Sequence, residues 1–221
     1  MEQAEGEGLN EQAELSPRDP PGQGRSDRKR QSILEAARTV FMEKGYAGAS
    51  MDEVAAVAKV SKQTVYKHFA DKQTLFTEIL TADMERRADE LVEALSATEG
   101  DPADLRQLAR RHIASIVKPE VMRMRRMVIG EADRFPELAR AWAQRGIEVG
   151  LAKLTERFAQ LSERGILRVE DPRRAAQHFN WLVLSTPLNR AMFDPGAEFS
   201  PRELDAFADE GTRVFLAAYG N

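Results

Sequence analysis

The sequence predicts an all-α fold of about nine helices, with an N-terminal three-helix domain containing a helix-turn-helix and a larger C-terminal helical domain. Apolar residues recur at helical spacing along most of the chain. Proline, glycine and N-cap residues divide the chain into helix-sized segments. No convincing strand pattern and no internal repeat is present.

The composition excludes several classes of protein. An apolar content of 42% is sufficient for a packed core, and no window holds the roughly 18 uninterrupted apolar residues of a membrane-spanning helix. The absence of cysteine excludes disulfides and thiolate chemistry. The N-terminus is acidic and polar, unlike a signal peptide, so we expect a cytoplasmic protein without a membrane partner.

The net charge of −4 is distributed unevenly along the chain. Residues 1–24 sum to −5, whereas residues 25–72 sum to +4. Such asymmetry favours a nucleic-acid contact in the basic segment, although an excess of this size can also arise by chance. We expect a disordered acidic tail over 1–26, a DNA-binding domain over 27–72 and a helical domain over 73–221.

The first helix is indicated by one apolar face. Ile33, Ala37, Val40 and Phe41 recur at spacings of four, seven and eight residues. Gly45 is expected to end this helix, since glycine commonly follows the last helical turn.

Two short helices follow, each with its own N-cap residue. Ser50 and Glu53 form the pattern of a capping box at the start of the second helix. Ser61 is the N-cap of the third helix, whose Val65 and Phe69 are expected to point inward.

The later helix boundaries follow from proline, glycine and N-cap residues. A fourth helix is expected over about 71–95, and a long helix over about 136–164. Pro187 lies inside an apolar helical run and predicts a kink or break there. The other boundary signals are Asp101-Pro102, Pro119, Gly165, Asp171-Pro172 and Ser200-Pro201.

Residues 50–68 have the spacing of a helix-turn-helix, which leaves Lys62, Gln63, Tyr66 and Lys67 on the exposed face of its second helix. Lysine can donate to guanine and glutamine can pair with adenine in a major groove. Tyrosine and histidine can reach phosphate oxygens. The alternative interpretation is an ordinary helical hairpin with a solvated polar face.

The residues around this segment resemble the N-terminal domain of TetR-family transcriptional regulators. The resemblance covers about a quarter of the chain after the tail, and it is most specific over Val60–Phe69. Lys59 departs from the family pattern, which usually has glycine at this turn; a positive φ there would cost lysine about 1 kcal/mol. The matching segments are Ala36–Phe41, Lys44–Tyr46, Ser50–Ala55, Val60–Phe69, Asp71-Lys72 and Leu75-Phe76.

The resemblance implies a ligand-responsive, dimeric regulator of transcription, most often a repressor, whose partners are double-stranded operator DNA, a second copy of the chain and an unknown small-molecule effector. The residues that would contact phosphates are Ser50, Thr64, Tyr66, His68 and Lys72. Those that would face base edges are Lys62, Gln63 and Lys67, while Arg28 and Lys29 would approach the backbone or an adjacent minor groove.

The resemblance also implies that the C-terminal domain binds the ligand and forms the dimer. The candidate pocket residues, each of which could equally belong to the core, are Met122, Met127, Phe135, Trp142, Phe158, His178, Phe179 and Trp181. The apolar residues expected to form the dimer surface are Phe179, Leu182, Leu184, Leu204, Phe207, Val214 and Phe215.

Two other classes of protein were weighed against a regulator: an enzyme and a helical adaptor. The sequence has no glycine-rich phosphate loop, nucleophile elbow or zinc motif, and its three histidines form no visible triad. We therefore expect no catalytic residues, no metal and no cofactor.

Overall fold

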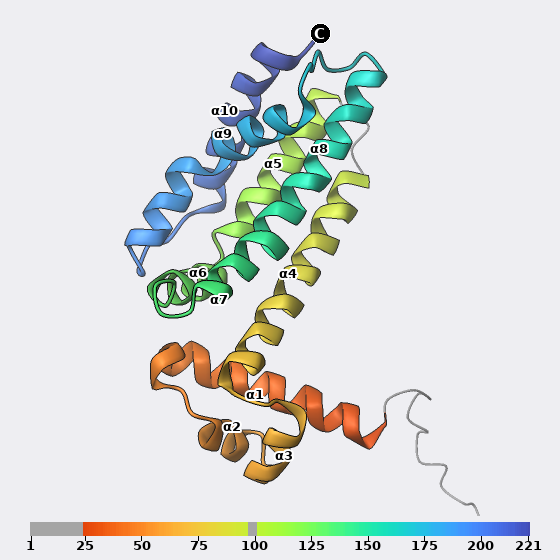
Figure 1. Cartoon of the computed structure of the whole chain (residues 1–221). Coiled ribbons are helices and arrows are strands. Elements are labelled where there is room, and N and C mark those ends of the chain that lie inside the picture. Colours follow the sequence, from red (N-terminus) through yellow and green to blue (C-terminus); the bar gives the residue numbers. More distant parts are fainter. Residues whose placement is uncertain (1–23, 97–100) are drawn as a thin grey trace, which may run out of the picture.

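In the computed structural model, which describes residues 24–96 and 101–221, a small N-terminal domain sits at one end of an elongated helical bundle (Figure 1). The small domain comprises α1 (Arg25–Gly48), α2 (Met51–Val57) and α3 (Lys62–His68). The fourth helix, α4 (Lys72–Ser96), begins in this domain and continues along the bundle, so it connects the two parts of the molecule.

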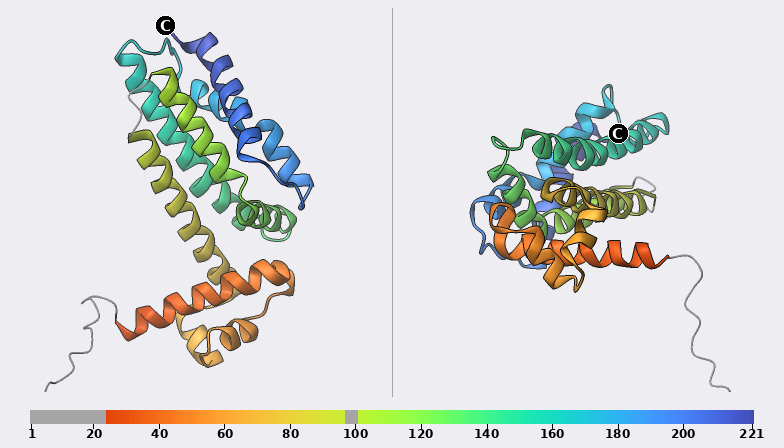
Figure 2. Two further views of the ribbon diagram at one scale, coloured as in Figure 1. Left: turned by 180° about the vertical axis from the view of Figure 1, so that it is seen from behind. Right: turned by 60° about the horizontal axis from the view of Figure 1, so that its bottom comes forward.

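The bundle is built from the remaining helices, most of which run along its length above the small domain in the left view of Figure 2. They are α5 (Pro102–Ile116), α6 (Pro119–Gly130), α7 (Pro136–Trp142), α8 (Glu148–Glu163), α9 (Pro172–Phe193) and α10 (Pro201–Tyr219). A π-helical turn, η1 (Ala143–Ile147), joins α7 to α8 without interruption. If α7, η1 and α8 are counted as one continuous helix, the described residues form nine helices, the number that the sequence predicts.

The capping residues act as the sequence predicts. The Oγ atom of Ser50 accepts from the backbone N–H of Glu53 at 3.2 Å, and the Glu53 carboxylate accepts from the backbone N–H of Ser50 at 3.3 Å. The Oγ atom of Ser61 accepts from the backbone N–H of Thr64 at 3.1 Å. The helical path of α1 breaks at Gly45, where φ is 74°, as expected for a glycine at a helix end.

The interior consists of two apolar clusters. The bundle cluster contains the mutually packed rings of Phe158, Phe179 and Phe215. The small-domain cluster contains Phe41 and Phe76, whose ring centroids are 4.9 Å apart. Four residues of α6 and α7 belong to this second cluster, so the small domain shares its core with part of the bundle: Met124, Val128, Leu138 and Trp142.

Three expectations need correction or lie outside the described residues. The long helix over 136–164 is present, but it contains the π-helical turn, which the sequence analysis did not predict. Helix α9 passes through Pro187 without the break considered from the sequence, although its direction changes along its length (Figure 1). The proposed tail falls mostly on residues 1–23, which are outside the described part; Arg25 and Ser26 already belong to α1.

The residues expected at the dimer surface fall into two groups. Phe179, Leu184 and Phe215 are buried within the bundle, so their assignment to a subunit interface was wrong: they face the core of the same chain. Leu182 and Val214 are exposed on α9 and α10. Leu204 and Phe207 are partly buried against the bundle core. Helical periodicity alone cannot tell which apolar face of a helix meets its own bundle.

No helix of the described residues is long and apolar enough to cross a lipid bilayer.

Candidate DNA interface and ligand pocket

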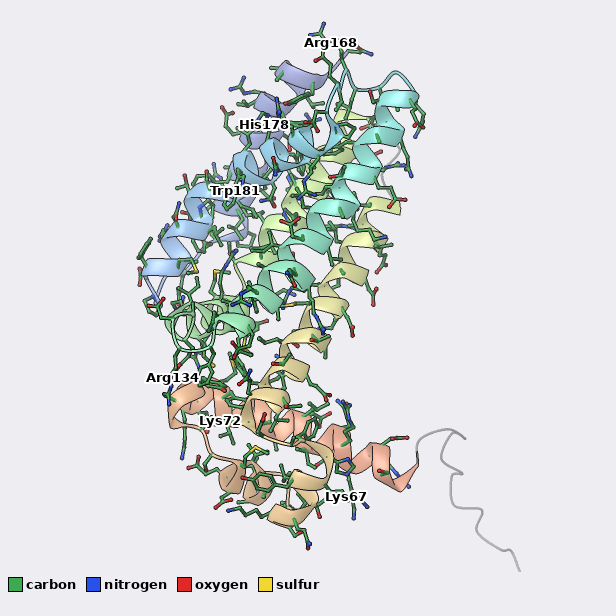
Figure 3. All side chains as sticks on the ribbon, in the orientation of Figure 1. Lys67, Lys72, Arg134, Arg168, His178 and Trp181 are labelled. Atoms are coloured by element: carbon green, nitrogen blue, oxygen red, sulfur yellow. The ribbon has the colours of Figure 1, made fainter. Side chains whose placement is uncertain are left out.

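Helix α3 presents a polar face to solvent because its apolar side is anchored. Val65 and Phe69 are almost fully buried against the small-domain core. The opposite side exposes the four side chains predicted from the sequence: Lys62, Gln63, Tyr66 and Lys67. Figure 3 places Lys67 at the end of the molecule away from the bundle. The helix is therefore free to enter a groove without a clash from the bundle.

The turn between α2 and α3 is a Schellman motif with lysine at its left-handed position. Lys59 has a φ of 55°, and it is the one non-glycine residue with positive φ in the described ranges. The backbone N–H of Val60 donates to the carbonyl of Ala55 at 3.0 Å, and the N–H of Lys59 donates to that of Ala56 at 3.2 Å. The helix-turn-helix geometry is thus kept despite the departure from glycine.

The first basic residue of α3 has an acidic neighbour. The Nζ atom of Lys62 lies 2.8 Å from Oδ1 of Asp52 on α2, and this hydrogen-bonded pairing raises the pKa of Lys62. Both side chains are more than half exposed, so the ion pair contributes little stability and is readily exchanged for another anion. A nucleic acid would compete with Asp52 for this ammonium group.

Lys72, which was expected to contact a phosphate, is bonded to the backbone of its own chain in this structure. Its Nζ atom donates to the backbone carbonyls of Tyr46, Ala49 and Ala47 at 2.8, 3.1 and 3.5 Å. It also lies 4.7 Å from the centre of the Tyr46 ring. An ammonium group has three donors, and all three are used within the protein here. Lys72 therefore ties the start of α4 to the end of α1.

The other predicted contacts lie on or near the exposed end of the small domain. Arg28 and Lys29 are exposed on the first turns of α1, and Ser50 is exposed at the start of α2. Thr64 and His68 are half-buried along α3. All five belong to the same small domain as the polar face of α3.

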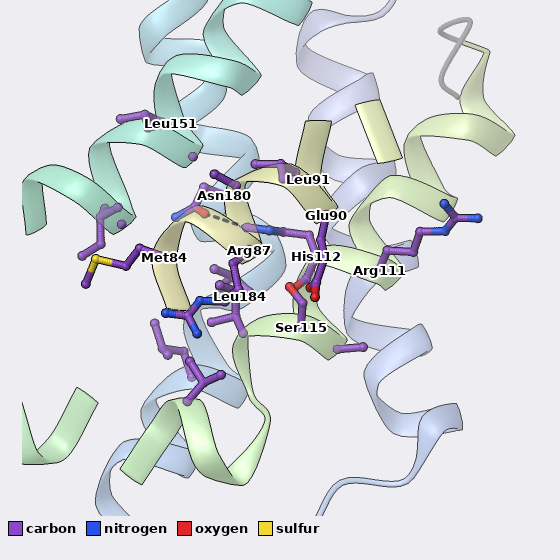
Figure 4. Close-up of a pocket in the computed structure, with 18 of the residues that line it drawn as sticks. Met84, Arg87, Glu90, Leu91, Arg111, His112, Ser115, Leu151, Asn180 and Leu184 are labelled. Carbon is purple, nitrogen blue, oxygen red and sulfur yellow. Dashed lines mark hydrogen bonds between the residues drawn. The ribbon is translucent and has the colours of Figure 1, made fainter. Parts of the chain in front are cut away.

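A pocket of about 620 Å³ lies inside the bundle, between α4, α5, α6, α8 and α9. Its size is within the range of small-molecule sites, about 300–1,000 Å³. Figure 4 shows Leu91, Leu151 and Leu184 around it, contributed by three different helices. Most of the wall is apolar, which suits the burial of an organic ligand.

Several polar groups also line the pocket. The Nε2 atom of His112 donates to Oδ1 of Asn180 at 2.9 Å, the interaction drawn in Figure 4. Burial lowers the pKa of His112, so its ring is neutral at neutral pH. Arg87 and Arg125 are half-buried and belong to the same lining.

Two of the eight pocket candidates from the sequence, Trp142 and Trp181, lie in the pocket lining. Met122, Phe158 and Phe179 instead form part of the bundle core, and Met127 and Phe135 pack against the small-domain core. The ring of His178 is bonded to the hydroxyl of Tyr219 at 2.7 Å on an exposed part of the surface.

The sequence analysis missed Arg87, His112 and Arg125. A signal was available for each, because each is a polar residue on the apolar face of a helix. Arg87 lies three residues after the buried Met84, His112 lies four after Leu108, and Arg125 lies four after Val121. A polar residue at such a position either faces a cavity or requires a buried partner.

The pocket and the small domain share part of their structure. Met84 and Trp142 belong to the small-domain core and also line the pocket. One residue before Met84, the buried carboxylate of Asp83 forms an ion pair with Arg38 of α1. This section of α4 therefore contacts both the pocket and the first helix of the small domain.

Both the small N-terminal domain and the helical bundle match known families of proteins. A sequence model described as bacterial regulatory proteins of the tetR family matches residues 33–79. A second, described as the C-terminal domain of AefR-like transcriptional repressors, matches residues 103–221, more than half of the chain. The chain belongs to the TetR family of transcriptional regulators.

Individual relatives of the chain are also regulators of transcription. A crystal structure of a TetR-family regulator from Mesorhizobium loti is 42% identical, with a TM-score of 0.86, and the match covers 90% of this chain and all of that one. The repressor Rv1474c of Mycobacterium tuberculosis is 27% identical over 73% of this chain and 81% of its own length. The activator FasR of Mycolicibacterium smegmatis is 38% identical, but the match spans only 38% of this chain and 36% of FasR.

As in other TetR-family regulators, the helix-turn-helix and the helical C-terminal domain lie in one chain. Among residues 24–96 and 101–221 there is no group of three or more His, Asp or Glu side chains placed to hold a metal ion.

Proposed function

We propose that this TetR-family chain is a homodimeric repressor that binds operator DNA through α3 and is released when a small-molecule effector occupies the bundle pocket. The observation that carries the proposal is the shared wall: Met84 and Trp142 line the pocket and belong to the core beneath the helix-turn-helix. An effector in contact with them acts on the DNA-binding domain without crossing an intervening layer.

The DNA contacts divide into those that read sequence and those that set position. Lys62, Gln63 and Lys67 face base edges in the major groove. The residues that approach phosphates or an adjacent minor groove are Arg28, Lys29, Ser50, Thr64, Tyr66 and His68. For Lys72, which the resemblance places among the phosphate contacts, we propose a positioning role, because its bonds hold α4 to the end of α1.

A second copy of the chain is required because one short recognition helix reads too few bases. A two-fold dimer reads two half-sites about 34–36 Å apart, or a multiple of this spacing. The surface proposed for pairing is the outer face of α9 and α10, where Leu182 and Val214 are exposed. The effector releases the dimer from DNA if it binds more tightly to a conformation in which the two recognition helices no longer match the spacing of the operator half-sites. An effector with equal affinity for both conformations would not change their populations.

The proposal involves binding alone and no enzymatic reaction. Since bacterial chromosomal DNA lies in the cytoplasm, we assign the protein to that compartment.

A gel-shift assay with the DNA upstream of the protein's own gene tests the function. We expect binding, with half-sites related by two-fold symmetry in a footprint. Lys62→Ala and Gln63→Ala should each relax the preference at one base pair per half-site, by about 1–3 kcal/mol. Lys153→Ala, a matched change on the bundle surface, should bind as the wild type does.

Unchanged base preference in both α3 variants would contradict the role assigned to this helix. A reporter gene behind the same DNA then gives the direction of regulation: deletion of the regulator should raise expression, and a fall would indicate an activator.

A further inference from the structure

Two cationic side chains stand within the mostly apolar wall of the bundle pocket. Arg87 projects from α4 and Arg125 from α6, and both are half-buried. Burial lowers the pKa of Arg87, and its neighbour Arg86 lowers it further. Burial also lowers the pKa of Arg125, and repulsion from the charge of Arg87, which lines the same pocket, lowers it further. Arginine remains protonated at neutral pH in spite of such shifts.

Neither guanidinium group forms a hydrogen bond or an ion pair within the described residues. The one specific contact is that of Arg87, whose guanidinium carbon lies 5.7 Å from the centre of the Trp142 ring. Three other half-buried arginines form ion pairs, which are Arg30 with Glu78, Arg38 with Asp83 and Arg110 with Asp209. Two more, Arg126 and Arg157, donate to neutral oxygen atoms. Partly desolvated cations without an anionic partner are costly.

The charges around the pocket favour an anion as the missing partner. The lining contains four basic residues, Arg87, Arg111, Lys118 and Arg125, against two acidic residues, Glu90 and Glu148. Glu148 is already paired with Arg173 at 2.6 Å. The charges of Glu90 and Glu120 raise the pKa of Arg87, but both residues are exposed and neither forms a hydrogen bond or an ion pair with this arginine.

We propose that the effector is an amphipathic organic anion, such as a carboxylate or sulfonate. Its charged group lies between Arg87 and Arg125, and its apolar body lies against Leu91, Leu151 and Leu184. This inference rests on the proposed function and adds the chemical class of the ligand. Charge-assisted hydrogen bonds from guanidinium groups are among the stronger polar contacts and fix orientation.

Ligands of other charge fit the same pocket less well. A cation would add a third positive charge next to two that already repel each other. A neutral apolar ligand would exclude water from both guanidinium groups and leave them unpaired. The neutral, hydrogen-bonded pair of His112 and Asn180 also lines the pocket and can form hydrogen bonds with a hydroxyl or carbonyl group of the ligand.

A pair of fluorescent probes tests the charge requirement directly. Anilinonaphthalene sulfonate and N-phenylnaphthylamine share one ring system, and only the first carries a negative charge. Titrated into the full-length protein, the sulfonate should bind at least about tenfold more tightly than its neutral counterpart, the size expected for hydrogen bonds to a charged group. Decanoate should displace the sulfonate at lower concentration than decanol does.

Three variants locate the site. In Arg87→Gln and in Arg125→Gln the preference for the sulfonate should fall by about tenfold. In Arg168→Gln, the same change at the far end of the bundle (Figure 3), the preference should equal that of the wild type. Equal binding of the two probes by the wild type would overturn the proposal. An unchanged preference in both pocket variants would do so as well.

Two further measurements keep these outcomes distinct. If either pocket variant fails to fold, the affinities of the wild-type protein decide whether the pocket prefers an anion. The affinities to compare are those of the two probes, and those of decanoate and decanol. Gel-shift of the wild type without any probe reports the proposed function separately. A protein that binds its operator but prefers the neutral probe would contradict only the proposal of an anionic effector. A protein that binds no DNA would contradict only the proposal of a repressor.

Discussion

Replacing Lys59 by glycine removes a backbone constraint at the turn of the helix-turn-helix. The residue has a φ of 55°, which costs a non-glycine residue about 1–2 kcal/mol. Relief of this strain by glycine is offset by about 0.5–1 kcal/mol, because glycine loses more backbone entropy than lysine when the chain folds. The side chain is exposed, so little packing is lost. We therefore expect Lys59→Gly to raise the free energy of unfolding by about 0.5–1 kcal/mol.

Lys59→Ala is the matched control, because it removes the same charge but keeps the Cβ atom that strains the turn. Thermal unfolding followed by circular dichroism should show Lys59→Gly melting about 1–4 °C above Lys59→Ala, given the size of the chain. If the two variants melted at the same temperature, the attribution of strain to this φ would be wrong.

The same two variants separate strain from charge in DNA binding. Both remove one positive charge beside α3. If Lys59 contacts a phosphate, both should reduce the salt dependence of operator binding by about 0.9 in the logarithmic slope. A difference between the two slopes would show that the turn geometry, and not the charge, affects the complex.

Three further predictions concern the bundle and its junction with the small domain. Lys72→Met removes the donor to three backbone carbonyls and should destabilise the protein by about 1–3 kcal/mol in urea unfolding, with no change in base preference. Gly211→Ala places a Cβ atom 2.7 Å from the carbonyl oxygen of Leu182, so it should cost about 1–3 kcal/mol as α9 and α10 separate. Val214→Glu puts a charge on the proposed dimer surface and should give monomers in sedimentation, with weak operator binding and normal helical content.

Each of these changes has a control elsewhere in the chain. Lys153→Met changes a lysine on α8 whose side chain is 44% exposed, and this protein should unfold as the wild type does. Gly130→Ala adds a Cβ atom to open space and should not destabilise. Ile129→Glu charges an exposed apolar residue outside α9 and α10 and should leave the sedimentation unchanged. A dimeric Val214→Glu protein would contradict an interface on α10. If a correctly folded Lys72→Met protein lost affinity equally for all DNA sequences, Lys72 would be restored to the phosphate contacts.

The helix-turn-helix was predictable because its signals are local. The capping box of Ser50 and Glu53 and the N-cap of Ser61 each lie within four residues and act through backbone hydrogen bonds. The positive φ of Lys59 is the case for which the cost to lysine was considered, because the family pattern usually has glycine at this turn. The bonds of Lys72 within the protein were not predicted, because its carbonyl partners lie more than twenty residues away in the sequence.

The pocket was only partly predictable, because large apolar residues fill cores and line cavities alike. Phe158 and Phe179 were candidates on account of their size, but both are fully buried in the bundle. The more informative residues were the polar ones on apolar helix faces, such as Arg87 and His112. Whether such a residue meets a partner or an open space depends on how several helices pack together, and a single sequence does not contain that distance information.

The π-helical turn over Ala143–Ile147 has a consequence for how the length of the chain could vary. A π-helical turn holds about one residue more than an α-helical turn. Deletion of one residue here would restore regular helical bonding and leave α8 close to its present rotation relative to α7, because the wider turn already accommodates the extra residue. A deletion in the regular part of α8 ahead of Gly150 would instead rotate the residues that follow by about 100° and remove Gly150 and Leu151 from the pocket wall. The π-helical turn is therefore the point in this helix where the chain can lose one residue while the effector site keeps its shape.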